Sequence, residues 1–318
     1  MAKILSSLHR INPYIKYFDV SMSDGLQSIP KKYTLSEKKT ILHSIINTYK
    51  PNCLEIGSIV SPRVVPQMKH SYELYKYANN FYNPIEKSEN ENENENENKN
   101  NNKTHTNITH NKCKFYLSVP PTKYYLNNAK SLNIRNISIM SSISNDYQEK
   151  YFKQSIQKTK EILRDTLKAP NTFDNVKLYV SCITNCPIKG KQDNEHIINQ
   201  LYEYLHIDGI TEVCLTDTSG NIRYSDFVHI IDYLGIEMNY KLDKLSLHLH
   251  YNDEKKYYTT DKIIEYALYN NIYKFDVSSF EYMYFGNGNI NIDAKSFNNN
   301  LTYDRLYEGI YNLSFNYL

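Results

Sequence analysis

The feature that most constrains the fold is a regular alternation of short strand-like runs and longer helical patterns along most of the chain. The runs are apolar and rich in β-branched residues, as expected for buried strands. They are YIKYFDV (14–20), NCLEIGS (52–58), CKFYLSV (113–119), IRNISIM (134–140), VKLYVSC (176–182), ITEVCLT (210–216), LDKLSLHLH (242–250) and IYKFDVS (272–278). The helical segments that follow them are 36–50, 64–81, 122–131, 147–168, 192–206, 224–234, 257–270 and 302–314.

Eight strand–helix units predict a closed, parallel (β/α)₈ TIM barrel. An open, doubly wound sheet is the alternative, but it usually has fewer units and a glycine-rich first turn. Here the first turn, SMSDGLQS, has one glycine and no GxGxxG. We therefore expect residues 1–318 to form one TIM-barrel domain.

One segment after the second helix does not fit this pattern. Its central part, SENENENENENKNNNKTHTNITHNK, is polar and of low complexity. Such a stretch has too little apolar surface to offset the entropy cost of ordering. We expect residues 84–112 to be a disordered insertion within the barrel domain.

Composition excludes several classes of protein. The formal charge of +2 gives no electrostatic basis for binding nucleic acid or an anionic membrane. No span reaches the ~18 apolar residues of a transmembrane helix. Five cysteines, an odd number in a long chain, argue against a disulfide framework. We expect a cytoplasmic protein with no nucleic-acid or membrane partner.

Polar residues collect where the predicted strands end. They are Asp19, Asp24, Glu55, Asp217, His248 and His250, and beyond the last strand Asn287, Asn289 and Asn291. The carboxyl ends of barrel strands converge on one mouth, where the loops form the active site of TIM-barrel enzymes. These side chains are therefore expected to lie near one another.

The stretch LSLHLHYND places His248 and His250 on the same face of a strand, with Cα atoms about 6–7 Å apart. Two imidazoles at this spacing can bind one metal ion. With the Asp24 carboxylate and an asparagine oxygen they form a nitrogen–oxygen set that suits Mg²⁺ or Mn²⁺, with Zn²⁺ also possible. HxH alone also occurs at ordinary polar strand ends, and Asp24 or Asp217 alone could be a helix cap or turn former. Their shared location favours the metal site.

Several segments also resemble one family in order along the chain. They are DVSMSDGLQ (19–27), LEIGSIVSPRVVPQM (54–68), YVSCITNCPIKGK (179–191), LTDTSG (215–220), LHLHYND (247–253) and FDVSS (275–279). Together they resemble the DRE-TIM metallolyases, and most of all the hydroxymethylglutaryl-CoA lyase branch. VSPRVVPQM and YVSCITNCP are specific to that branch, whereas DTSG or HxH alone would not be.

The resemblance implies a divalent cation, Mg²⁺ or Mn²⁺, and an acyl-CoA substrate that is cleaved to acetyl-CoA and a keto acid. A homodimer is also common in the family. The implied metal ligands are Asp24, His248, His250 and Asn289, where Gly288-Asn289 matches the family's SGN. The implied catalytic residues are Glu55, Asp217 and His248, and the implied substrate-binding residues are Gln27 and Ser23.

The chain departs from the family at two places. Ser23 stands where the family has an arginine that stabilises the developing enolate, and losing one such group costs roughly 10²–10³ in rate. The family's cysteine loop is replaced by FEYMYFGNGN (280–289), which contains no cysteine. Arg63 or Lys31 could supply a substitute cation.

Three hypotheses follow from these matches and departures. The first is an active metal-dependent lyase for a 3-hydroxyacyl-CoA. The second is a catalytically impaired relative that acts as a binding protein. The third is other chemistry on the same scaffold, such as a Claisen-type acyl transfer. We expect this to be the weaker hypothesis, because synthases usually need a C-terminal extension and this sequence ends about where the eighth helix should.

Overall fold

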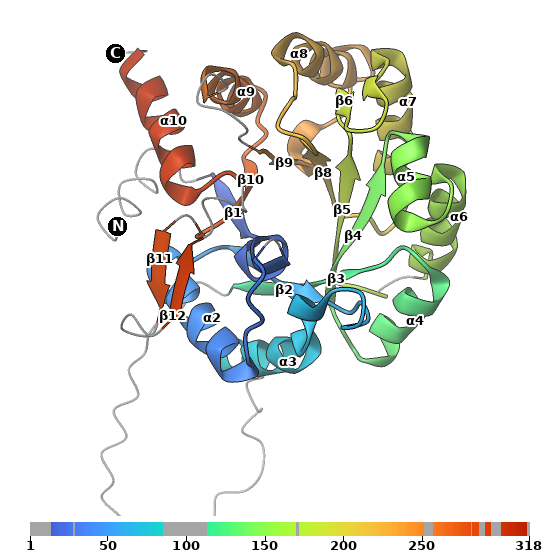
Figure 1. Cartoon of the computed structure of the whole chain (residues 1–318). Coiled ribbons are helices and arrows are strands. Elements are labelled where there is room, and N and C mark those ends of the chain that lie inside the picture. Colours follow the sequence, from blue (N-terminus) through green and yellow to red (C-terminus); the bar gives the residue numbers. More distant parts are fainter. Residues whose placement is uncertain are drawn as a thin grey trace, which may run out of the picture.

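The computed structural model describes residues 14–27, 29–84, 113–169, 172–250, 257–280, 282–285, 290–293 and 300–316. Eight parallel strands close into a barrel in the order β1-β10-β9-β8-β5-β4-β3-β2 (Figure 1), which confirms the (β/α)₈ prediction. The barrel strands are β1 (Lys16–Asp19), β2 (Cys53–Ser58), β3 (Lys114–Val119), β4 (Asn136–Ser142), β5 (Asn175–Ser181), β8 (Glu212–Thr216), β9 (Leu245–His248) and β10 (Lys274–Val277).

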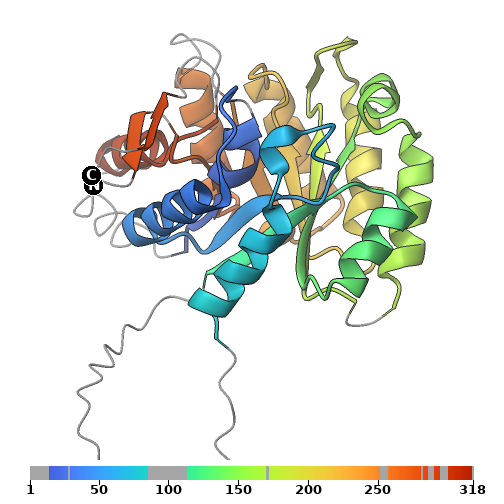
Figure 2. The same ribbon diagram turned by 60° about the horizontal axis from the view of Figure 1, so that its bottom comes forward.

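The helices lie around the outside of the strands, as the tilted view shows (Figure 2). They are α2 (Leu35–Tyr49), α3 (Ser71–Tyr82), α4 (Lys123–Ser131), α5 (Asn145–Phe152), α6 (Ile156–Leu167), α7 (Asn194–Leu205), α8 (Tyr224–Asp232), α9 (Tyr257–Tyr269) and α10 (Tyr303–Asn316). None of the described helices is long and apolar enough to cross a membrane.

Side-chain alternation along the strands separates an apolar layer from a polar barrel interior. On β5, the buried residues Val176, Leu178 and Val180 belong to the large apolar core that the strands and helices share. The alternate residue Lys177 points into the barrel instead, where its Nζ lies 3.8 Å from the centroid of the Phe18 ring. Because successive residues of a strand point to opposite faces, this single strand serves both layers.

The predicted helix 147–168 is two helices in the structure. Helix α5 ends at Phe152, and Lys153 follows it in the left-handed conformation with φ 56°. Ser155 then caps α6, because its side chain accepts a hydrogen bond from the Lys158 backbone N–H. A left-handed residue and a new N-cap end one helix and begin the next, so the amphipathic pattern alone did not reveal the break.

The predicted helix 64–81 begins later, at Ser71, because a 3₁₀ turn η2 (Pro66–Met68) precedes it. Two short antiparallel hairpins were not predicted. They are β6 (Asn185–Cys186) with β7 (Gly190–Lys191), and β11 (Tyr282–Phe285) with β12 (Ile290–Asp293). Of the expected insertion 84–112, residues 85–112 lie outside the described residues.

Candidate metal centre and active site

A pocket of about 610 Å³ lies at the carboxyl ends of the barrel strands. Its lining includes six residues singled out from the sequence, namely Ser23, Asp24, Gln27, Glu55, His248 and His250. They come from the short helical turn after β1, from β2 and from β9 and the residues after it. Barrel closure therefore brings residues near positions 24 and 250 of the sequence to one mouth.

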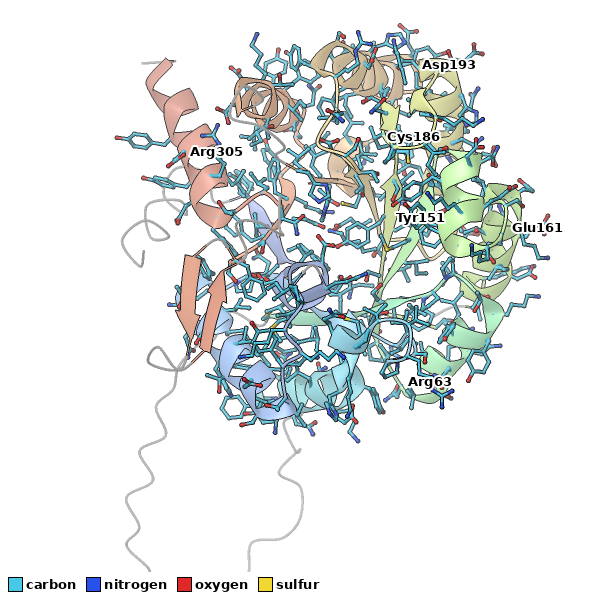
Figure 3. All side chains as sticks on the ribbon, in the orientation of Figure 1. Arg63, Tyr151, Glu161, Cys186, Asp193 and Arg305 are labelled. Carbon is cyan, nitrogen blue, oxygen red and sulfur yellow. The ribbon has the colours of Figure 1, made fainter. Side chains whose placement is uncertain are left out.

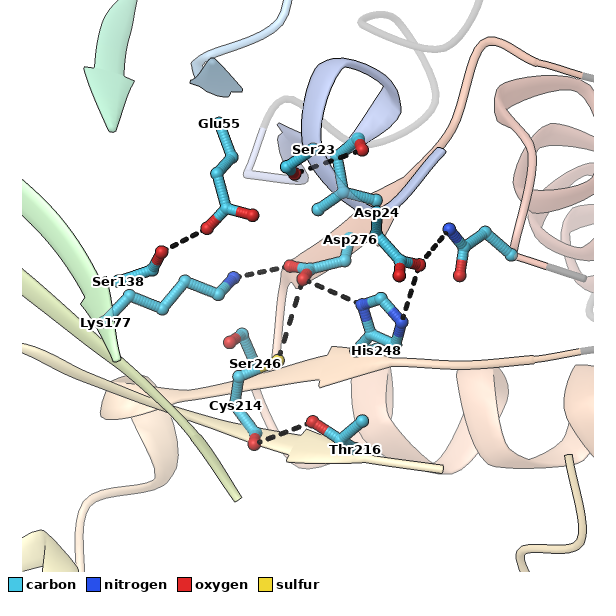
Figure 4. Close-up of polar contacts among 12 residues, drawn as sticks. Ser23, Asp24, Glu55, Ser138, Lys177, Cys214, Thr216, Ser246, His248 and Asp276 are labelled. Carbon is cyan, nitrogen blue, oxygen red and sulfur yellow. Dashed lines mark hydrogen bonds and ion pairs between the residues drawn. The ribbon is translucent and has the colours of Figure 1, made fainter. Parts of the chain in front are cut away.

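Asp24, His248 and His250 form the cluster at the base of this arrangement. One potential ligand atom from each lies within 4.8 Å of the other two. The Nε2 atoms of His248 and His250 are 3.1 Å apart. His248 Nε2 is 3.9 Å from Asp24 Oδ2 (Figure 4). Three potential donor atoms thus lie close enough together to share one cation.

Each imidazole is held from behind by a hydrogen-bond acceptor. His250 Nδ1 donates to the Asp217 backbone carbonyl at 2.6 Å, and His248 Nδ1 lies 3.1 Å from the Asp276 carboxylate. A ring nitrogen that donates in this way carries the proton, so the neutral ring presents a lone pair at Nε2. Two such lone pairs 3.1 Å apart repel each other unless a proton or a cation lies between them.

The pKa values of the two histidines move in opposite directions. Burial lowers the pKa of His250 to about 4, and the neighbouring His248 adds to this shift. Burial also opposes protonation of His248, but the Asp276 and Asp24 carboxylates outweigh it and raise the pKa of His248. Protonation of His248 is therefore favoured over protonation of His250, and a divalent cation would compete with that proton.

An asparagine, Asn300, lies beside the Asp24 carboxylate of the cluster. Its side-chain Nδ2 donates to Asp24 Oδ2 at 2.6 Å, and its backbone forms an isolated β-bridge with His250. The predicted ligand Asn289 lies outside the described residues. Asn300 was missed because it stands in the run FNNN of an asparagine-rich chain, where no single asparagine is conspicuous.

These residues fit a divalent cation. One carboxylate, one amide and two imidazoles whose second nitrogens have partners are the donor set and the supporting hydrogen bonds that Mg²⁺, Mn²⁺ or Zn²⁺ sites use. Asp24, His248 and His250 line the open pocket, and Asn300 contacts Asp24. A bound ion would therefore remain accessible to substrate.

Glu55 lies deeper in the pocket wall and is 5% exposed. The Ser138 hydroxyl donates a short hydrogen bond to its carboxylate (Figure 4). Burial raises the pKa of Glu55 to about 7, although the Ser138 and Ser23 hydroxyls oppose the shift. A carboxyl group with this pKa exchanges a proton readily at neutral pH.

Asp217 supports the metal-ligand cluster through its backbone carbonyl rather than through its side chain. Its carboxylate turns to the following loop, where Oδ1 accepts hydrogen bonds from the backbone N–H groups of Asn221 and Ile222. Its backbone carbonyl holds His250, as described above. The structure therefore places Asp217 behind the cluster rather than in the pocket lining.

No arginine or lysine is among the described residues that line the pocket. Arg63 is exposed and lies near the edge of the molecule in Figure 3. Lys31 pairs with Glu37 at 3.2 Å. Neither supplies the positive charge that the Ser23 position lacks.

One wall of the pocket is apolar and aromatic. It is formed by Met140 of β4 and by Tyr147, Tyr151 and Phe152 of α5. The Tyr147 and Tyr151 rings lie 4.4 Å apart. Tyr151 is 54% exposed although it lines the pocket (Figure 3), so this wall is continuous with the surface around the mouth.

The fold and the site define a (β/α)₈ barrel with an Asp–His–His cluster at its mouth. No family model matches the sequence.

Relatives include the hydroxymethylglutaryl-CoA lyase of Pseudomonas mevalonii, 24% identical over 222 residues that cover 69% of this chain and 62% of the relative. Another is the 3-hydroxy-3-isohexenylglutaryl-CoA/hydroxymethylglutaryl-CoA lyase of Pseudomonas aeruginosa, 21% identical over 65% of this chain and 58% of that protein. The aligned part thus spans about three fifths of these two relatives.

Solved structures with the same fold include hydroxymethylglutaryl-CoA lyase from Pseudomonas aeruginosa. Its TM-score is 0.68 at 19% identity, over 94% of this chain and 85% of that one. The lyase from Brucella melitensis gives 0.64 at 18% identity, over 94% and 97% of the two chains. The chain is a divergent homologue of the hydroxymethylglutaryl-CoA lyases, as the sequence motifs indicated.

Proposed function

We propose that this protein is a divalent-metal-dependent carbon–carbon lyase that cleaves a 3-hydroxyacyl-CoA to acetyl-CoA and a keto acid. The observation that carries the proposal is the convergence of Asp24, His248, His250 and Asn300 beside one open pocket. It occurs in a chain whose curated relatives carry the name hydroxymethylglutaryl-CoA lyase. That thioester is therefore the leading substrate.

Asp24, His248, His250 and Asn300 would hold the cation in this proposal. A bound divalent cation would position the substrate hydroxyl and a carboxyl-side oxygen, and would make that hydroxyl more acidic. The outer hydrogen bonds from His248 to Asp276 and from His250 to Asp217 keep both Nε2 atoms directed at the site.

Glu55 is the described side chain best suited to move the proton. It lines the pocket, its pKa is about 7, and the Ser138 hydroxyl fixes one carboxylate oxygen. In the reaction the substrate hydroxyl loses its proton, the C–C bond breaks, and its electron pair forms the acetyl-CoA enolate. The enolate then takes up a proton to give acetyl-CoA, so one proton leaves the hydroxyl and one is returned to carbon.

The remaining pocket residues bind rather than react. Gln27 and Ser23 line the polar side next to Asp24. The wall of Met140, Tyr147, Tyr151 and Phe152 offers apolar contact to the acyl part of a substrate. Asp217 is a positioning residue, because it acts on the site through His250.

The proposal is tested by incubating the purified protein with hydroxymethylglutaryl-CoA and Mg²⁺ or Mn²⁺ and measuring acetyl-CoA release. We expect metal-dependent release that is abolished by a chelator and restored by added metal. The matched control is Glu55→Gln, which keeps the shape of the pocket but cannot exchange the proton. Absence of release with metal bound would contradict the lyase proposal.

The second candidate, a catalytically impaired binding protein, is favoured by one observation. The described residues that line the pocket include no arginine or lysine, and Ser23 stands where the resembled lyases have an arginine. In that case the protein would bind metal and acyl-CoA without turnover. Equilibrium binding of the thioester, measured beside the acetyl-CoA assay, separates the two candidates.

A further inference from the structure

The interior of the barrel beneath the histidine pair contains a buried ion pair that joins two opposite parts of the sheet. Lys177 of β5 and Asp276 of β10 are each 1% exposed at the side chain, and Lys177 Nζ lies 2.5 Å from Asp276 Oδ1. The two residues are 99 positions apart in the chain. The other carboxylate oxygen, Oδ2, is the atom that faces His248 Nδ1 at 3.1 Å (Figure 4).

Such a pair is unusual inside a barrel, which is normally filled by branched apolar side chains. Desolvating two charges often costs more than their attraction returns, so a buried ion pair is weak evidence for a stabilising role. Its position offers a different explanation, because one carboxylate oxygen of Asp276 contacts Lys177 and the other contacts His248, a candidate metal ligand.

The contacts leave Asp276 little freedom to turn. Oδ1 is bound by Lys177, whose Nζ is held in turn by Glu212 Oε1 at 2.8 Å and by the face of the Phe18 ring. Oδ2 is therefore directed at His248, together with a distant thiol contact from Cys214 at 3.9 Å. A carboxylate oxygen can only accept a hydrogen bond, so the nitrogen that faces it must donate.

We propose that Asp276, anchored by Lys177, is a positioning residue that assigns the His248 ring proton to Nδ1 and so prepares Nε2 to bind a cation. The proposal rests on the metal centre proposed above. His250 obtains the same preparation from the Asp217 backbone carbonyl, which no side-chain substitution removes. Of the two acceptors behind the histidine pair, Asp276 is thus the one that a side-chain substitution can remove.

The test is Asp276→Asn, which keeps the shape but can present an amide N–H to the ring. In metal-free protein at an alkaline pH, where the ring is neutral, ¹⁵N shifts of the imidazole identify the protonated nitrogen. We expect the wild-type His248 to carry the proton at Nδ1 and the variant to move it to Nε2. Mn²⁺ titration should show about 10- to 100-fold weaker binding.

Glu212→Gln is the matched control, because it removes the other carboxylate on Lys177 without touching His248. We expect it to keep both the Nδ1 proton and the Mn²⁺ affinity. If Asp276→Asn keeps the wild-type tautomer, or if Glu212→Gln weakens Mn²⁺ binding equally, Asp276 is not the positioning residue.

Should Asp276→Asn fail to fold, Lys177→Met/Asp276→Asn removes both charges and the same readouts apply, because deleting a whole buried pair is tolerated better than deleting half of it. A wild-type protein that binds no Mn²⁺ contradicts the proposed function instead. The tautomer of His248 is measured without metal and still decides the inference.

Discussion

The side-chain amide of Asn300 donates a hydrogen bond of 2.6 Å to the carboxylate of Asp24, across a separation of 276 residues. The contact forms where the last part of the chain returns to the barrel. Ser278 bridges to Thr302 and His250 bridges to Asn300. The cluster therefore depends on barrel closure between β1 and β10, and on the segment that precedes α10.

This relationship predicts which asparagine serves the cation. We expect Asn300→Ala to weaken Mn²⁺ binding about tenfold or more, because it removes an oxygen donor and frees the Asp24 carboxylate. Asn289→Ala is the comparison variant and should bind Mn²⁺ like the wild type. Isothermal titration of both proteins with Mn²⁺ decides the matter, and a loss confined to Asn289→Ala would return the ligand to that position.

Removing one histidine should abolish the site. His248→Ala takes away one donor and leaves the Asp276 carboxylate buried without its ring partner. We expect the purified variant to contain no stoichiometric divalent metal by elemental analysis. His229→Ala, at an exposed position on α8, should retain the wild-type metal content. Equal metal content in all three proteins would show that the ion binds elsewhere.

Placing an arginine at position 23, where the resembled lyases have one, should raise the turnover rate. Ser23 is buried against the pocket, and its hydroxyl interacts with Glu55. We expect Ser23→Arg to raise kcat for hydroxymethylglutaryl-CoA by roughly 10²–10³, because a fixed positive charge would stabilise the enolate oxygen. Ser23→Met adds a long side chain without charge and should not raise kcat. An Arg variant no faster than the Met variant would show that the missing charge is not what limits turnover.

Asp19 predicts a pH dependence of stability. It is fully buried, and burial raises its pKa to about 6, although hydrogen bonds from Ser21 and Tyr303 oppose the shift. The folded protein therefore binds the proton more tightly than the unfolded chain does. This contribution is fully present below the unfolded pKa of 3.8 and is lost as pH rises through 6, a change of about 3 kcal/mol.

Urea unfolding between pH 4 and pH 8 measures this effect as the difference between wild type and Asp19→Asn. The wild type should lose stability relative to the variant as pH rises, because only the wild type must bury a charge. Asp208→Asn, at an exposed position, is the control and should follow the wild type. A difference that does not change with pH would contradict the assignment to Asp19.

The prediction of the barrel from sequence succeeded because the information is local. Each strand is a short apolar run, and most helices begin and end close to the predicted residues. Asp24, His248 and His250 were expected to meet because the ends of parallel barrel strands share one mouth, and the structure brings them together. The break at Lys153 was missed because a left-handed residue followed by a serine cap leaves the amphipathic pattern almost unchanged.

The supporting contacts were decided only by the tertiary structure. Lys177 in the middle of an apolar strand was a visible signal, since Lys177, Tyr179 and Ser181 share one strand face. Its partner Asp276 could not be identified, because strand order and stagger determine which interior residues meet across a barrel. The contact between Asn300 and Asp24 likewise required the path of the returning chain. Sequence periodicity thus determined which residues point into the barrel, whereas closure of the sheet determined which of them touch.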